Sequence, residues 1–104
     1  MLPRSDAQHN SETVELRQAA GLWLKKQREA AGLSQRELAR ILRFDYYTFI
    51  SQLENGRGRI PPSRYRDYAA ALGVDEKGFV KTLLMFYDPV SYAILFDDEK
   101  DAGL

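Results

Sequence analysis

The sequence predicts an all-α domain of five helices with a short sixth helix near the C-terminus. Apolar residues recur at helical spacing, and no segment alternates with the two-residue period of a strand. Capping residues, glycines and prolines divide the chain into short segments. A length of 104 residues is enough for one domain with a modest core.

The first two helices lie on either side of Gly32. The first is expected over residues 11–31, and its buried face has four members: Ala20, Trp23, Leu24 and Ala31. The second, over 34–42, begins with a capping box, because Ser34 can accept from a free backbone amide while the Glu37 carboxylate reaches back. Its buried side is formed by Leu38, Ala39, Ile41 and Leu42.

Four further helices follow. The third is expected over 45–55, with Asp45 as its N-cap. Its buried residues are Phe49, Ile50 and Leu53. The fourth is expected over 62–72, where a proline suits the first turn. The fifth is expected over 75–87, capped by its aspartate, and the short sixth over 90–96.

The net charge of zero hides a segregation of charge along the chain. Residues 17–66 contain eleven basic and four acidic residues, whereas the segments on both sides are net acidic. A basic middle is a plausible footprint for a polyanion, although a solvated helical surface has the same composition. No cysteine occurs, so disulfides and thiolate metal sites are excluded. Without a signal peptide or an apolar stretch of the ~20 residues that span a bilayer, we expect a cytoplasmic, nucleoid-associated protein that does not contact membranes.

Two short helices joined by a turn and followed by the basic loop 57–60 form a unit that can dock one helix in a DNA major groove. Over about residues 24–84 the chain resembles the phage-repressor (Cro-type, xenobiotic-response-element) helix-turn-helix family. The motifs that carry the resemblance are Gly32-Leu33-Ser34-Gln35, Glu37-Leu38-Ala39, Ile50-Ser51-Gln52-Leu53-Glu54-Asn55-Gly56 and the segment Ala69 to Val74. The resemblance implies a compact, lambda-repressor-like DNA-binding domain over 11–88. A flexible leader, 1–10, is expected before it, and a C-terminal extension with an acidic tail, 89–104, after it.

The turn departs from the family pattern. The family usually has a glycine directly after the last leucine of its second helix, where this chain has Arg43. Counted back from Gly56, one extra residue lies between the two helices. Either the turn is longer or the third helix begins earlier.

The outward face of helix 45–55 is the expected reading surface, because its apolar residues are needed inside. We assign base reading to Tyr47, Thr48, Ser51 and Gln52. A glutamine amide can pair with adenine, and a threonine can bond a base or contact a thymine methyl. Alternatively, the ring of Tyr46 or Tyr47 only covers the longer turn.

A second set of residues is expected to contact phosphates: Gln35, Arg36, Tyr46, Asn55, Arg57 and Arg59. Such contacts position a protein on DNA without selecting a sequence. By the resemblance, Gln35 matches a glutamine that contacts phosphate at the start of the second helix. Arg28 and Glu54 match a pair that ties the first helix to the third, so we assign them a structural role.

The apolar content beyond Phe79 exceeds what a five-helix module can bury, which indicates a self-association surface. The residues assigned to dimerisation are Leu84, Tyr87, Tyr92, Leu95 and Phe96. The alternative is that the sixth helix folds back over the first helix and Trp23.

These features predict a sequence-specific, double-stranded-DNA-binding transcriptional regulator, such as a prokaryotic repressor, that acts as a homodimer without metal or cofactor. The main alternative is an antitoxin whose C-terminal segment binds a toxin, or another regulator, while the helix-turn-helix represses their operon. An enzyme is not expected. The single histidine, His9, lies in the polar leader, and no Gly-rich phosphate loop, metal-ligand cluster or nucleophile beside a base is present.

Overall fold

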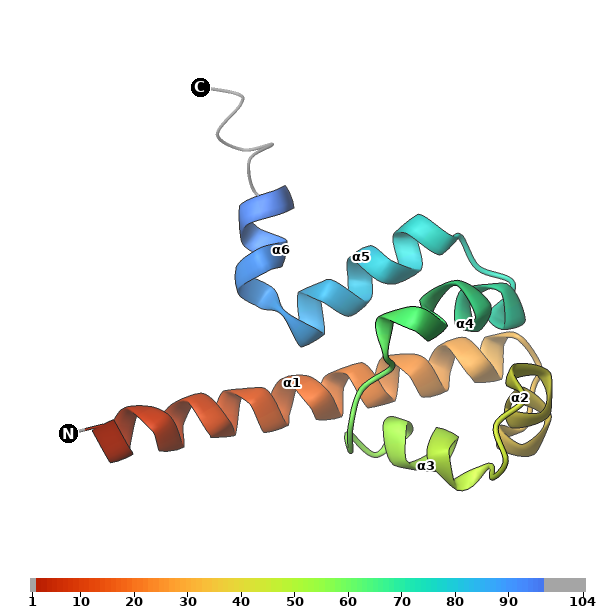
Figure 1. Ribbon diagram of the computed structural model, residues 1–104, viewed down its shortest axis with the longest axis horizontal. Coiled ribbons are helices and arrows are strands. Elements are labelled where there is room, and N and C mark those ends of the chain that lie inside the picture. Colours follow the sequence, from red (N-terminus) through yellow and green to blue (C-terminus); the bar gives the residue numbers. More distant parts are fainter. Residues whose placement is uncertain (1, 97–104) are drawn as a thin grey trace.

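The computed structural model of the chain describes residues 2–96 and the side chains of residues 11–96. Its elements are α1 (Leu2–Ala30), α2 (Gln35–Leu42), α3 (Thr48–Glu54), the 3-10 turn η1 (Pro62–Arg64), α4 (Tyr65–Leu72), α5 (Glu76–Tyr87) and α6 (Pro89–Phe96). The described residues form helices and no strand, which confirms the predicted all-α fold of five helices and a short sixth (Figure 1). The predicted acidic tail lies outside the described residues.

α1 is the longest helix, with α2 and α3 at its C-terminal end and α5 along its side (Figure 1). The predicted start at residue 11 is wrong, because the helix begins at Leu2 and residues 2–10, expected as a leader, are helical. Pro3 suits a first helical turn, and no other proline or glycine interrupts the chain before Gly21. Nothing in the local sequence therefore stops the helix from extending to Leu2.

The core lies between the C-terminal half of α1 and helices α2 to α5. Its main members are Leu24, Leu38, Ile50, Leu53, Ile60, Tyr68, Leu72, Phe79 and Leu83. Burial raises the pKa of Tyr68, whose hydroxyl has no hydrogen-bond partner among the described residues. Two residues predicted to be buried are exposed: Ala31 follows the end of α1, and Ile41 lies at the margin of α2 with half of its surface free.

α1 and α3 approach most closely at Gly21. A Cβ atom at this position would overlap the backbone carbonyl groups of Leu53 and Glu54. A glycine inside a helix costs about 1 kcal/mol relative to alanine. Here the glycine allows the C-terminal end of α3 to pack directly on the backbone of α1.

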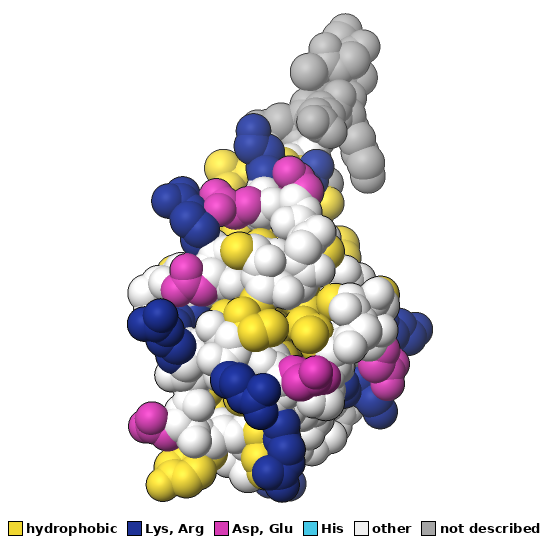
Figure 2. Space-filling model, turned by 90° about the vertical axis from the view of Figure 1, so that its right-hand side faces the viewer, with side chains coloured by type: hydrophobic (Ala, Val, Ile, Leu, Met, Phe, Trp, Pro, Cys, Tyr) yellow, Lys and Arg dark blue, Asp and Glu magenta, His cyan; other side chains and the backbone are white. Residues whose placement is uncertain are grey.

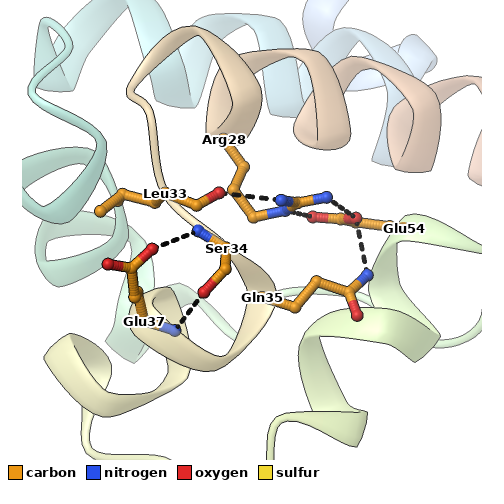
Figure 3. A network of polar contacts seen from close by, with 6 residues as sticks. All are labelled: Arg28, Leu33, Ser34, Gln35, Glu37 and Glu54. Carbon is orange, nitrogen blue, oxygen red and sulfur yellow. Dashed lines mark hydrogen bonds and ion pairs between the residues drawn. The ribbon is translucent and has the colours of Figure 1, made fainter.

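The capping box predicted at the start of α2 is confirmed. The Glu37 amide donates to Ser34 Oγ at 3.0 Å, and the Ser34 amide donates to Glu37 Oε1 at 2.8 Å (Figure 3). Hydrogen bonds from the backbone and the side chain of Ser34 lower the pKa of Glu37. Two of the free amides at this helix end are thereby satisfied within the chain.

α2 ends in a left-handed residue that is not glycine. Arg43 has φ 60° and ψ 38°, the conformation that helix ends usually give to glycine. Its amide donates to the Arg40 carbonyl at 3.1 Å, and the Phe44 amide donates to the Ala39 carbonyl at 2.9 Å. Arg43 thus takes the place of the family glycine and closes the helix at a conformational cost.

The extra residue lengthens the turn. Residues 43–47 form the connection, and α3 begins at Thr48 with Tyr47 at the N-cap position. The alternative of an earlier start of α3 is therefore wrong, and so is the prediction that Asp45 caps it. Because no side chain caps α3, its position depends on tertiary contacts.

α6 packs on α5 and contributes no buried residue. The α5 N-cap predicted at Asp75 is confirmed, since the Gly78 amide donates to Asp75 Oδ2 at 2.7 Å. Asp88 separates α5 from α6 and accepts from the Ser91 amide at 3.1 Å, and hydrogen bonds from Ser91 lower its pKa. Two aromatic rings of α5 face Trp23. The ring centres of Phe79 and Phe86 lie 5.4 and 6.1 Å from the centre of the Trp23 ring.

A buried ion pair joins the C-terminal ends of α1 and α3 (Figure 3). Arg28 Nε donates to Glu54 Oε2 at 2.7 Å, and Arg28 Nη2 donates to Glu54 Oε1 at 3.0 Å. The side chains are 10 and 3% exposed, and the hydrogen bond to Glu54 raises the pKa of Arg28. Two further contacts complete the network: Arg28 Nη1 donates to the Leu33 carbonyl at 2.8 Å, and Gln35 Nε2 donates to Glu54 Oε1 at 3.0 Å.

We expect Arg28→Ala to destabilise the fold strongly in urea denaturation. The substitution strands a buried Glu54 carboxylate, and comparable buried pairs lose about 3–5 kcal/mol when one partner is removed. Arg66→Ala is a matched control, because Arg66 pairs with Glu76 at 2.9 Å in an exposed position that contributes little. Equal losses in the two variants would contradict a structural role for Arg28.

We expect Arg43→Gly to stabilise the protein by about 1 kcal/mol, because glycine adopts positive φ without a steric penalty. The measurement is the free energy of unfolding in urea. Arg43→Lys keeps both the charge and the Cβ atom, so its stability should match that of the parent chain. A glycine variant no more stable than the lysine variant would show that the left-handed turn carries no strain.

Candidate nucleic-acid interface

The outward face of α3 carries hydrogen-bonding side chains. Ile50, Leu53 and Glu54 are buried, so the helix is fixed with its opposite face toward solvent. Of the predicted base readers, Tyr47, Thr48 and Gln52 are exposed and Ser51 is half-buried. Thr48 and Gln52, four residues apart, lie on one line along the helix.

The two tyrosines of the turn differ in their surroundings. The Arg36 guanidinium lies 4.4 Å from the centre of the Tyr47 ring, a cation–π contact that joins the turn to α2. Tyr46 is 75% exposed. Tyr47 is therefore held against α2, and Tyr46 presents its ring to solvent.

Gln35, a predicted phosphate contact, belongs to the buried network. Its Nε2 donates one hydrogen to Glu54, which leaves the second amide hydrogen for another acceptor. The residue stands at the start of α2, where backbone amides favour anions. Sequence reasoning did not find the bond to Glu54, because the two residues come from different helices.

The basic loop after α3 is attached to α5 and α1 through Tyr87. The Ile60 amide donates to the Tyr87 hydroxyl at 3.2 Å, and Arg59 lies 4.8 Å from the centre of its ring. Arg17 of α1 lies 5.5 Å from the same ring and donates from Nη1 to the Gly58 carbonyl at 3.3 Å. Burial raises the pKa of Tyr87. Tyr87, predicted for dimerisation, thus supports the loop, and no local sequence signal indicates this or the part played by Arg17.

Basic side chains also surround α2 and the turn. Viewed from the end of the molecule where α2 and α4 lie, Lys and Arg side chains are spread over the surface among Asp and Glu side chains, and several lie in its lower half (Figure 2). The arginines of this region include Arg36, Arg40, Arg43 and Arg64. The predicted phosphate contacts Asn55 and Arg57 are exposed at the other end of α3. Positive charge therefore lies on both sides of the reading face.

The predicted dimerisation residues are only partly exposed as a group. Leu95 is 60% exposed, together with Val90 and Ile94 on the same helix. The Tyr92 and Phe96 rings lie 5.0 Å apart and are half-buried, as is Leu84. Among the predicted dimerisation residues, the exposed one is thus Leu95 of α6.

Within the described part of the chain, no group of three or more acidic or histidine side chains is placed to hold a metal ion. In the same part, no helix combines the length and the apolar character that a membrane crossing needs.

Comparison with known families agrees with this geometry. A family model described as a helix-turn-helix domain matches residues 15–78, more than half of the chain and the whole segment from the middle of α1 to the start of α5. No curated protein has a sequence that matches this chain significantly. Three features of the structure fit this family match: the capped α2, the buried ion pair that ties α1 to α3, and the exposed outer face of α3. The chain belongs to the helix-turn-helix domain family of DNA-binding proteins.

Proposed function

We propose that the protein is a sequence-specific transcriptional regulator that reads the major groove of double-stranded DNA with α3 and acts as a homodimer. The observation that carries the proposal is the orientation of α3. Its inner face is held by a buried ion pair, and its outer face presents polar side chains between two positively charged regions. A helix held in this way fits a groove about 12 Å wide.

Base reading falls to the outer face of α3. Gln52 is exposed, and its amide can pair with the N6 and N7 positions of adenine. Thr48 lies one turn before it and can contact a base or a thymine methyl. Tyr47 and Ser51 flank this line and complete the reading set.

Phosphate contacts fall on both sides of α3. At the start of α2, the free amide hydrogen of Gln35 and the exposed Arg36 and Tyr46 can meet one strand. Beyond the C-terminal end of α3, Asn55, Arg57 and Arg59 can meet the next phosphates, with Arg17 as an addition from the structure. Such contacts set the register of the helix in the groove.

Dimerisation falls to α6. Val90, Ile94 and Leu95 are each at least 60% exposed on a helix that buries no residue. One helix reads too few base pairs to specify a site, whereas a two-fold pair places two reading helices ~34 Å apart on one side of the duplex. A second copy of the chain is therefore the partner that we propose for the exposed surface of α6, because its binding also improves DNA recognition.

The antitoxin alternative uses the same α6 surface for a toxin, with the helix-turn-helix as the operon repressor. Catalysis is not part of the proposal, because helix-turn-helix DNA-binding proteins are typically not enzymes. A cytoplasmic, nucleoid-associated location follows from DNA as the partner.

We expect Gln52→Ala to weaken binding to the preferred duplex by about 1–3 kcal/mol and to leave binding to random DNA almost unchanged. Arg57→Ala is the matched control for a phosphate contact. It should weaken both complexes alike and reduce the slope of log K against log salt by about one. Fluorescence anisotropy at several salt concentrations measures both quantities. Equal loss on both duplexes for Gln52→Ala would remove this residue from the reading set.

We expect Leu95→Asp to convert a dimer into a folded monomer that binds a palindromic duplex weakly and without cooperativity. Leu22→Asp is the matched control, because both leucines are 60% exposed and Leu22 lies on α1. Sedimentation velocity at micromolar concentration gives the oligomeric state. A parent chain that is monomeric both free and on a palindromic duplex would contradict the homodimer. A co-purifying small protein lost with Leu95→Asp would favour the antitoxin.

A further inference from the structure

A hollow opens on the surface between the lengthened turn and the start of α3. These two segments lie at the lower right of Figure 1. We call the hollow the turn pocket. Eight residues line it: Arg43, Phe44, Asp45, Tyr46, Thr48, Phe49, Gln52 and Arg64. Five of them belong to residues 43–47 and the first residue of α3, so the lengthened turn supplies much of the lining.

The floor of the turn pocket is aromatic and fixed. The rings of Phe44 and Phe49 meet edge to face with their centres 4.8 Å apart, and both are half-buried. The Arg64 guanidinium lies 4.6 Å from the centre of the Phe44 ring and 3.5 Å from Asp67 Oδ2. These contacts, from Phe49 of α3 and from Arg64 of η1, hold the floor in place before any ligand binds, which lowers the entropic cost of binding.

The wall of the turn pocket is continuous with the reading face of α3. Thr48 and Gln52 line the pocket and lie on the exposed line of α3. Tyr46 also lines the pocket and is 75% exposed, so its ring is free to pack against an incoming group. A group that enters the pocket therefore lies beside the base that Gln52 contacts.

Charged residues of both signs, one aspartate and two arginines, line the turn pocket. Asp45 also lines it, and its carboxylate would repel an anion that entered. Arg43 and Arg64 also line the pocket, and the Arg64 guanidinium lies against the Phe44 ring. The aromatic floor favours an uncharged apolar group within.

Duplex DNA has one apolar group in its major groove, the C5-methyl of thymine. We propose that the turn pocket binds the methyl group of a thymine next to the base read by Gln52. Tyr46 and the γ-methyl of Thr48 form its sides, and the Phe44 and Phe49 rings form its base. This inference rests on the proposed function, and it makes the lengthened turn a determinant of sequence preference.

The test replaces each thymine of a preferred duplex, selected from a random pool, by deoxyuridine, which lacks only the C5-methyl. At one thymine per half-site, we expect binding by the full chain to weaken about fourfold, the value of burying one methyl-sized group. The other replacements should leave the dissociation constant unchanged.

Two variants connect this effect to the pocket. Tyr46→Ala removes one wall, and Thr48→Ser removes the γ-methyl but keeps the hydroxyl. In both variants, the dissociation constants for the thymine duplex and for the duplex with deoxyuridine at that position should be nearly equal. Ile41→Ala is the matched control, because Ile41 is exposed in the separate hollow between α2 and α4 and should leave the ratio of the two dissociation constants unchanged.

The outcomes separate this inference from the proposed function. If a preferred duplex is found but no deoxyuridine replacement weakens binding, the methyl pocket is wrong and the regulator stands. If both pocket variants still bind the thymine duplex more tightly than the deoxyuridine duplex, the proposal that the pocket binds the methyl group is also wrong. If selection yields no preferred duplex, sequence-specific reading itself fails and the pocket with it.

Discussion

The buried ion pair between Arg28 and Glu54 sets the geometry on which the proposed reading surface depends. A buried charge without its partner is costly, so neither α1 nor α3 can turn without separating the two groups. Because Gln35 also bonds Glu54, the start of α2 is tied to the same carboxylate. One acidic side chain at the end of α3 thus aligns three helices, and the outward face of α3 follows from this alignment.

The pair acts together with a close approach of backbones. Gly21 lets α3 lie directly on α1, at the point where the Glu54 carbonyl meets the helix. Short, uncapped helices are marginal alone, and α3 has seven residues and no side-chain cap. Its helical state is therefore a product of these contacts with α1 and α2. A rigid, externally held helix suits recognition, because little conformational entropy is lost when it enters a groove.

The regions on either side of α3 are supported by different elements. Tyr87, at the end of α5, bonds the Ile60 amide and carries Arg59 and Arg17 on its ring, so the basic loop depends on α5 and α1. The lengthened turn depends on the left-handed Arg43 and on Arg64 at the end of η1. Tyr87 is separated from α6 by Asp88 alone, so the proposed dimer surface and the basic loop meet at one helix end.

The sequence by itself determined the helical class and the helix ends that have local causes. Ser34, Glu37 and Asp75 bond amides three residues away in the chain, so their roles follow from neighbouring residues alone. For α3, three apolar positions at helical spacing predict which residues face outward, and the ion pair to α1 then holds the helix in that orientation. Tertiary structure decided the rest. Contacts between helices far apart in sequence decide four features: the start of α3 at Thr48, the exposure of Ile41, the bond from Gln35 to Glu54 and the support of the basic loop by Tyr87. Local propensity does not contain these contacts, because each requires a partner that only the folded chain brings near.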